Sequence, residues 1–291
     1  MTRIRIRHES VYTWQAPVNL GLWRLLMRPQ DTHATRLLDA ALETPPGDIK
    51  WFYDAYGNSV CTLAPYAQAD RLTVVNQLLV ERYPAQLDLQ SLADLSLATP
   101  ITYGMDDRVV LEPYIKPATA DCDPGYVDWM QRHLPQPGEL AVGFLQRINA
   151  SIHQEFAYNA RNAYGTQSPN QTLAYGSGTC RDFAWLMIES MRRWGFAARF
   201  ATGYLHSPGA QVRGAGATHA WCEVFLPDHG WIEFDPTNGL AESSSLIRIA
   251  ATRTWWEASP MNGGPPPELP CQLDVAVTVE AVDDAALSSA A

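Results

Sequence analysis

The sequence predicts an α+β protein with a strand-rich first part and a mixed core of helices and sheet, and three observations carry this prediction. Polar and apolar residues alternate with a period of two through much of the first third of the chain, as in strands that bury one face. Apolar residues recur at helical spacing from Glu139 to Phe156 and again after Cys180. Two strand-like runs, 218–225 and 231–235, then flank a turn-forming cluster.

These segments divide the chain into four parts. Residues 1–84 are expected to form a β-rich domain, and residues 85–138 a connector with a short helix, because prolines interrupt its pattern. Residues 139–240 form the predicted core, and residues 241–291 an extension that ends in a strand and a frayed tail. The expected strands of the first and last parts are 2–14, 36–43, 48–53, 71–83 and 273–282, and the expected helices are 126–133, 139–156 and the segment that Cys180 opens.

Cys180 is the most informative residue of the chain. Gly176 and Gly178 lead directly into it, and it opens an amphipathic helix that stops at Gly195. At such a position the unpaired backbone N–H groups and the positive end of the helix dipole favour a thiolate, and the same N–H groups can receive an oxyanion. We therefore expect Cys180 to be a nucleophile. The competing interpretation is a buried thiol at a helix cap.

His219 and Asp235 are the candidate base and orienting residue. His219 begins the first strand of a predicted hairpin, and Asp235 ends the second, immediately before a proline. Opposed residues of an antiparallel pair point to the same face. A two-residue loop would set Asp235 opposite Cys222, on the wrong face, whereas a loop of three or five residues sets it opposite Trp221, diagonal to His219. We expect the odd-numbered loop, which lets Cys180, His219 and Asp235 act as nucleophile, base and orienter. The polar segment 157–175 and the glycine-rich segment 206–217 are expected to wall the cleft around them.

Several of these residues also have ordinary structural interpretations. His219 alone would be read as a core histidine, and Asp235 as a turn residue. Asp182, in the first helical turn, is explained by the helix dipole. The spacing His219-x-x-Cys222 does not predict zinc, because residues three apart on a strand point to opposite faces. Cys222 is expected to be a small core residue.

Three motifs resemble the bacterial transglutaminase-like family, in that family's order of Cys, His and Asp. They are Gly-Thr-Cys-Arg-Asp-Phe-Ala at 178–184, Thr-His-Ala-Trp at 218–221 and Gly-Trp-Ile-Glu-Phe-Asp-Pro-Thr-Asn at 230–238. The segment from His8 to Asn58 is similar to the β-rich N-terminal region that often precedes this core in bacteria. The resemblance implies a papain-like α+β core, in which the helix that carries the nucleophile packs on an antiparallel sheet. Nothing resembles an all-oxygen calcium loop, and no metal or cofactor is expected.

Two positions depart from the family's pattern. Trp185 replaces a common histidine on the nucleophile helix, and Thr254-Trp255-Trp256 stands where Arg-Asp-Tyr is usual. Neither change removes Cys180, His219 or Asp235. We expect both changes to affect the choice of substrate.

The resemblance implies an enzyme that works through a thioester intermediate. Cys180 would attack a side-chain or backbone amide, His219 would protonate the leaving amine and then activate the acceptor, and Asp235 would hold the imidazole. An amine acceptor makes the enzyme a transferase, and a water acceptor makes it a cysteine peptidase or amidase. From another class, a non-catalytic module could use the same fold to present a peptide-binding groove. The intact set of three residues counts against that alternative.

The composition favours a soluble, cytoplasmic protein with a protein or peptide substrate. A net charge of −10 argues against nucleic acid or an anionic membrane as the partner. Residues 1–8 alternate charged and apolar side chains, unlike the apolar run of a signal peptide, and no segment has the length of a membrane span. The five cysteines are scattered without framework spacing, which suits a reducing compartment.

Overall fold

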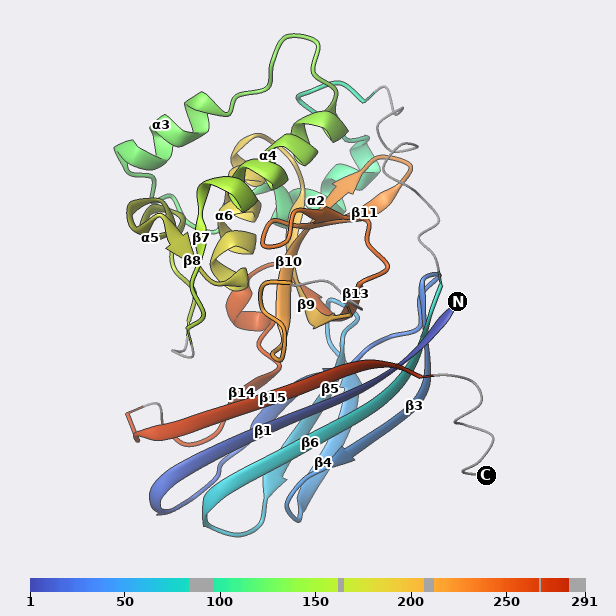
Figure 1. Ribbon diagram of the computed structural model, residues 1–291, viewed down its shortest axis with the longest axis vertical. Coiled ribbons are helices and arrows are strands. Elements are labelled where there is room, and N and C mark those ends of the chain that lie inside the picture. The colour runs from blue at the N-terminus through green and yellow to red at the C-terminus, as the bar shows by residue number, and fades with distance from the viewer. Residues whose placement is uncertain (84–96, 162–164, 207–211, 267, 283–291) are drawn as a thin grey trace.

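The protein consists of a strand-only part and a part in which helices cover a sheet, seen at the bottom and top of Figure 1. The α+β class predicted from the sequence is confirmed. This architecture comes from a computed structural model that describes residues 1–83, 97–161, 165–206, 212–266 and 268–282.

The strand-only part holds two antiparallel sheets of four strands that pack face to face. One sheet has the order β15-β1-β6-β3, and the other has the order β14-β2-β5-β4. Apolar side chains from β1, β2, β5 and β6, among them Trp14, Leu25, Cys61 and Leu72, fill the space between the sheets. The strands are β1 (Thr2–Val18), β2 (Trp23–Arg28), β3 (Thr35–Glu43), β4 (Gly47–Tyr53), β5 (Ser59–Pro65), β6 (Ala69–Arg82), β14 (Met261–Gly263) and β15 (Cys271–Val282).

Strands β1, β3, β4 and β6 correspond to segments that the alternating pattern predicts, whereas β2 and β5 were not expected. The reason is burial on both faces. Leu25 of β2 and Cys61 of β5 face the interior of the sandwich, while Leu26 and Val60 pack against Ala250 of the helix-bearing part. A strand covered on both sides has no alternation of polar and apolar residues to reveal it.

The C-terminal segment returns to both parts of the molecule. β13 (Leu246–Thr252) pairs with β9 (Ala198–Leu205), β14 pairs with β2, and β15 pairs with β1 from Arg3 to Trp14. The strand expected near the end of the chain is therefore present, and it completes the N-terminal sheet. The expected frayed tail, 283–291, and the first part of the expected connector, 84–96, lie outside the described residues.

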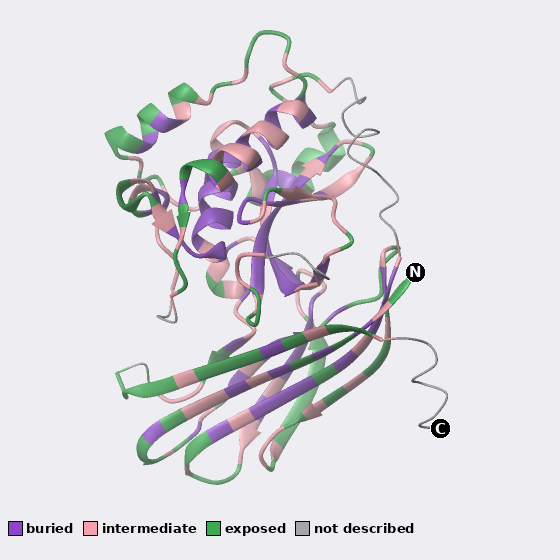
Figure 2. Ribbon diagram, viewed as in Figure 1, coloured by how far each residue is buried: buried purple, intermediate pink, exposed green. Residues whose placement is uncertain are grey.

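The helix-bearing part is built on a five-stranded antiparallel sheet of order β12-β11-β10-β9-β13. Helix α6 (Cys180–Arg193) packs on it: Phe183, Met187 and Met191 share a buried cluster with Cys222 and Val224 of β10. Figure 2 shows that burial concentrates on α6 and the adjoining strands. The remaining elements are β10 (His219–Leu226), β11 (Gly230–Asp235), β12 (Leu240–Ala241), β7 (Ala157–Tyr158), β8 (Ser177–Gly178), α2 (Met105–Ile115), α3 (Pro124–Arg132), α4 (Ala141–Glu155), α5 (Pro169–Tyr175) and the 3-10 turn η1 (Trp255–Glu257).

Helices α3, α4 and α6 were expected, but α2 and α5 were not. In α2 only Leu111 is buried, while Met105, Val109 and Val110 are exposed, so the helix has no apolar stripe for sequence reasoning to detect. The short α5 begins with a cap in which the Ser168 side chain accepts a hydrogen bond from a backbone N–H. Within the described segments, no helix has the combination of length and hydropathy that crossing a membrane requires.

The two parts share a buried, partly polar boundary. Ile6 of β1 and Val80 of β6 pack against Ile247 of β13. Beside them, His8 Nδ1 lies 3.0 Å from the Tyr204 hydroxyl, and both side chains are buried. Burial lowers the pKa of His8 to about 4, so this histidine is a neutral hydrogen-bonding group of the boundary.

Candidate active site

The hairpin of β10 and β11 sets the geometry of the site. Leu226 pairs with Gly230, which leaves the three residues 227–229 as the loop, and Asp228 adopts a left-handed φ of 65° within it. The expected odd-numbered loop is confirmed. Because Cys222 pairs with Phe234, the next step of the register sets Asp235 opposite Trp221.

From that position the Asp235 carboxylate reaches the imidazole of His219. His219 Nε2 donates to Asp235 Oδ2 at 2.8 Å, and both side chains are fully buried. The Asn238 amide also donates to Oδ2, at 2.9 Å, and the backbone N–H of Thr237 donates to Oδ1, at 2.9 Å. Burial alone would raise the pKa of Asp235, but the charge and hydrogen bond of His219, with the Asn238 and Thr237 donors, hold it below its usual value.

The second ring nitrogen of His219, Nδ1, is not bonded to Asp235. Nδ1 is buried and has no hydrogen-bond partner among the described residues. Burial works to lower the pKa of His219, but the charge and hydrogen bond of Asp235, together with the nearby Cys180 side chain, outweigh it and raise the pKa to about 10. An imidazolium is therefore favoured beside Cys180.

Cys180 is the first residue of α6, and only 7% of it is exposed. Its backbone N–H therefore belongs to the first turn, where N–H groups have no partner within the helix. Gly178 precedes it in β8, where a side-chain carbon would lie 2.9 Å from Asp182 Cβ and 3.1 Å from Phe183. Only glycine fits there, which explains this part of the motif.

Asp182 has a larger role than the dipole interaction expected from the sequence. Its buried carboxylate accepts hydrogen bonds from the Thr179 N–H at 2.8 Å and from the Thr179 hydroxyl at 2.9 Å. Its other oxygen accepts from the Gln167 N–H at 2.7 Å and from Arg161 at 2.9 Å. The carboxylate thus ties the segment before α5 to the residue that precedes Cys180.

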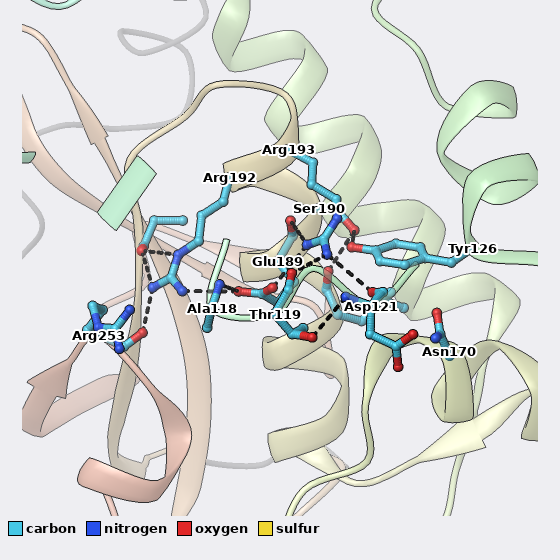
Figure 3. Close-up of polar contacts among 12 residues, drawn as sticks. Ala118, Thr119, Asp121, Tyr126, Asn170, Glu189, Ser190, Arg192, Arg193 and Arg253 are labelled. Atoms are coloured by element: carbon cyan, nitrogen blue, oxygen red, sulfur yellow. Dashed lines mark hydrogen bonds and ion pairs between the residues drawn. The ribbon is translucent and has the colours of Figure 1, made fainter. Parts of the chain in front are cut away.

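The opposite end of α6 is fixed by a buried charge cluster (Figure 3). The Glu189 carboxylate accepts from Arg192 at 3.1 Å, from Arg193 at 3.0 Å and from the Ala118 N–H at 3.0 Å. Arg192 in turn donates to the Ala198 carbonyl of β9 at 2.9 Å. With both ends anchored, the helix holds Cys180 at a defined place relative to the sheet.

Tyr158 and Gly214 also belong to the site; the sequence placed both in segments expected to wall the cleft but gave neither residue a role of its own. Tyr158 lies opposite Gly178 in the parallel pair of β7 and β8. A side-chain carbon at Gly214 would lie 3.3 Å from the Tyr158 hydroxyl and 3.4 Å from His219 Nδ1. The polar segment 157–175 and the glycine-rich segment 206–217 were expected to wall the cleft. Tyr158 comes from the first of these segments and Gly214 from the second. Residues 162–164 and 207–211 of the same segments lie outside the described residues.

The two departures from the family pattern contact one another. The rings of Trp185 and Trp256 are 6.2 Å apart in an edge-to-face arrangement. Arg192 lies over the Trp185 ring at 5.6 Å from its centroid. The changes at the nucleophile helix and near the C-terminus therefore form one aromatic contact.

A separate cavity of about 280 Å³ lies between the two parts of the molecule, and Cys180, His219 and Asp235 are not among its lining residues. Glu223 is held there by Arg199 at 2.6 Å and Arg248 at 3.0 Å. Glu233 stands opposite Glu223 in the hairpin and also lines the cavity. Burial and the charges of Glu223 and Glu242 raise the pKa of Glu233 to about 8.

Comparison with known proteins identifies the family. Residues 134–236 match the model of the transglutaminase-like superfamily, and residues 4–81 match the bacterial transglutaminase-like N-terminal region. The chain carries a transglutaminase-like core preceded by a bacterial transglutaminase-like N-terminal region. The resemblance seen in the sequence motifs is thereby confirmed.

Three proteins that are similar to this transglutaminase-like protein share a third or less of the aligned residues with it. An uncharacterised protein of Mycobacterium tuberculosis is 25% identical over 279 residues, which cover 90% of this chain and 87% of the relative. The protein-glutamine gamma-glutamyltransferase of Pseudomonas aeruginosa is 32% identical over 124 residues, which cover 39% of this chain and 18% of that protein. The crystal structure of a proposed cysteine protease from Cytophaga hutchinsonii has a TM-score of 0.74 at 20% identity and covers 97% of this chain and 91% of that chain. This likeness shows the same fold.

Proposed function

We propose that this transglutaminase-like protein is a cysteine-dependent acyl-transfer enzyme that acts on amide bonds of proteins or peptides through a thioester. One observation carries the proposal. A buried imidazole, bonded through Nε2 to Asp235, leaves Nδ1 without a partner among the described residues, beside a cysteine at a helix N-terminus. This arrangement supplies a nucleophile, a proton carrier and an orienting carboxylate.

The proposed reaction proceeds in two halves. The Cys180 thiolate forms a bond to the amide carbonyl carbon, and the C–N bond then breaks as His219 gives its proton to the leaving amine. In the second half the neutral His219 takes a proton from the acceptor, which attacks the thioester and releases Cys180. Asp235 keeps the imidazole oriented and stabilises its charged form.

An amine is the acceptor that we favour. The similarity to the Pseudomonas aeruginosa protein-glutamine gamma-glutamyltransferase spans 124 residues. It supports a glutamine side chain as the acyl donor, and transfer of the acyl group rather than its hydrolysis. Hydrolysis of the same intermediate by water is the alternative outcome, and it would make the protein a peptidase or amidase.

The test is to incubate the protein with a glutamine-containing peptide and a fluorescent primary amine, following both ammonia release and amine incorporation. We expect both signals from the wild-type protein and neither from Cys180→Ser. Cys271→Ser, which changes an exposed cysteine of β15, is the matched control and should keep full activity. Ammonia release or peptide cleavage without incorporation would assign the hydrolytic alternative. If Cys180→Ser matches the wild type in every assay, the proposal is wrong.

A further inference from the structure

Tyr158 presents a hydroxyl group that the proposed reaction has not yet used. The parallel pair of β7 and β8 sets Tyr158 opposite Gly178, two residues before Cys180. Its ring packs against the buried cluster that contains Cys180 and Phe183. The pairing therefore fixes the ring at the N-terminal end of α6.

Gly214 locates the hydroxyl relative to the imidazole. A single side-chain carbon at Gly214 would lie 3.3 Å from Tyr158 Oη and 3.4 Å from His219 Nδ1, so both atoms border the same small space. Within the described part of the chain, no group is hydrogen-bonded to Tyr158 Oη. Neither of the two polar atoms that border this space, Oη and Nδ1, therefore has a hydrogen-bond partner among the residues that the structure describes.

The electrostatic surroundings keep this hydroxyl protonated. Burial and then the charge of Cys180 raise the pKa of Tyr158 to about 12; Asp182 and Asp235 add to the increase, and Arg181 opposes it. A protonated phenol can donate a hydrogen bond throughout the pH range in which the proposed thioester reaction would proceed. It cannot serve as a base there.

The attack of a thiolate on an amide needs such a donor. As the C–S bond forms, the electron pair of the carbonyl moves onto oxygen, and preorganised donors stabilise the resulting charge. The backbone N–H of Cys180 is one donor at the helix N-terminus. A second donor near the sulfur would complete an oxyanion site of this kind.

We propose that Tyr158 is a further catalytic residue, whose hydroxyl donates a hydrogen bond to the acyl oxygen while Cys180 attacks. This inference rests on the proposed function. Tyr158 transfers no proton, because its hydroxyl keeps its hydrogen throughout. The oxyanion collapses to the thioester, and the amine leaves with the proton of His219. Tyr158 and the Cys180 N–H together form the oxyanion site.

The test compares Tyr158→Phe with the wild type in two reactions of the same thiol. Acylation by p-nitrophenyl acetate passes through an oxyanion, and alkylation by iodoacetamide does not. We expect acylation to slow by about 100-fold, the effect of losing one oxyanion donor. Alkylation of Cys180 should keep its wild-type rate and pH profile. Tyr66→Phe, which removes an exposed hydroxyl from the strand-only part, is the control and should change neither rate.

The outcomes separate this inference from the function on which it rests. Equal acylation rates for Tyr158→Phe and the wild type overturn the inference alone. Parallel loss of acylation and alkylation also overturns it, because Tyr158 would then support the thiolate or the fold. A wild-type protein that is alkylated at Cys180 but never acylated contradicts the proposed function, and the inference with it.

Discussion

Asp235 Oδ2 lies 2.8 Å from His219 Nε2, although the two residues are not directly opposed in the hairpin. The register pairs Cys222 with Phe234, which puts Asp235 opposite Trp221 and on the same face as His219. The three-residue loop is the cause, because a loop shorter by one residue would turn the carboxylate to the other face. The distance between the two side chains thus depends on the length of a loop at the far end of the strands.

Asp235→Asn tests whether this carboxylate orients His219 or only ends a strand. We expect the variant to fold and to lose about three orders of magnitude in the rate of Cys180 acylation, because the amide favours the wrong tautomer and no longer stabilises the imidazolium. The measurement is single-turnover acylation beside thermal unfolding. Asp228→Asn at the hairpin tip is the control, since asparagine tolerates its left-handed φ of 65°. An unchanged acylation rate with a lowered melting temperature would remove Asp235 from the proposed mechanism.

Alkylation of Cys180 should depend on the charge of His219. The pKa of His219 is raised to about 10, so the imidazolium persists at all lower pH values and favours a thiolate next to it. We expect iodoacetamide to modify Cys180 much faster than Cys61, Cys122, Cys222 or Cys271 in the wild type, with a rate that persists into mildly acidic solution. His219→Ala should lose the rate at acidic pH first. Uniform labelling of all five cysteines, mapped by mass spectrometry, would contradict the prediction.

Asp182→Asn should both destabilise the protein and slow Cys180 chemistry. The carboxylate accepts four hydrogen bonds in full burial, and an amide would place its N–H₂ group against donors. Breaking such a buried network costs about 3 kcal/mol of unfolding free energy, measured by chemical denaturation. Asp128→Asn on α3, where the carboxylate is exposed, should cost almost nothing. Equal stabilities of the two variants would show that the network does not anchor α6.

Glu233→Gln should stabilise the protein at alkaline pH. The pKa of Glu233 rises from 4.5 to about 8 on folding, so the folded chain holds a proton that the unfolded chain releases. The stability that Glu233 contributes through this bound proton is complete below pH 4.5 and is lost as the pH rises to about 8. The neutral glutamine avoids that loss. We expect a higher melting temperature than wild type at pH 9 and a difference that shrinks towards pH 5, whereas Glu280→Gln on exposed β15 should show no such trend.

Gly214→Ala separates crowding of the site from backbone strain. Gly214 and Gly216 have similar left-handed φ values of 85° and 80°, but only Gly214 has neighbours that an added carbon would touch. We expect both alanine variants to lose about 1 kcal/mol of stability, because the left-handed conformation is unfavourable for a residue with a side chain. Acylation of Cys180 should fall only in Gly214→Ala, because its methyl group crowds His219 and Tyr158. Equal acylation rates in the two variants would place the Gly214 loop away from the reacting atoms.

Local patterns in the sequence determined the class of fold, the α6 helix and the rule that relates the hairpin loop length to the sheet face of Asp235. Apolar spacing after Cys180 predicts a helix that buries one stripe, and parity along 219–235 places Asp235 on the face of His219 when the loop has an odd number of residues. Both are relationships between residues within one element or one hairpin, so period and loop length are sufficient to fix them. The motif Gly-Thr-Cys-Arg-Asp-Phe-Ala likewise contains Gly178, whose lack of a side chain is required by Asp182 and Phe183.

Only the tertiary structure decided which distant segments complete the site. Tyr158 reaches it through the parallel pairing of β7 with β8, and Gly214 reaches it from a loop that carries no local pattern pointing to Nδ1. Strand β2 was not expected because its residues are covered on both faces, and β15 joins β1 from the other end of the chain. Contacts between segments far apart in sequence arise from packing complementarity, and a one-dimensional pattern records only the periodicity of each segment by itself.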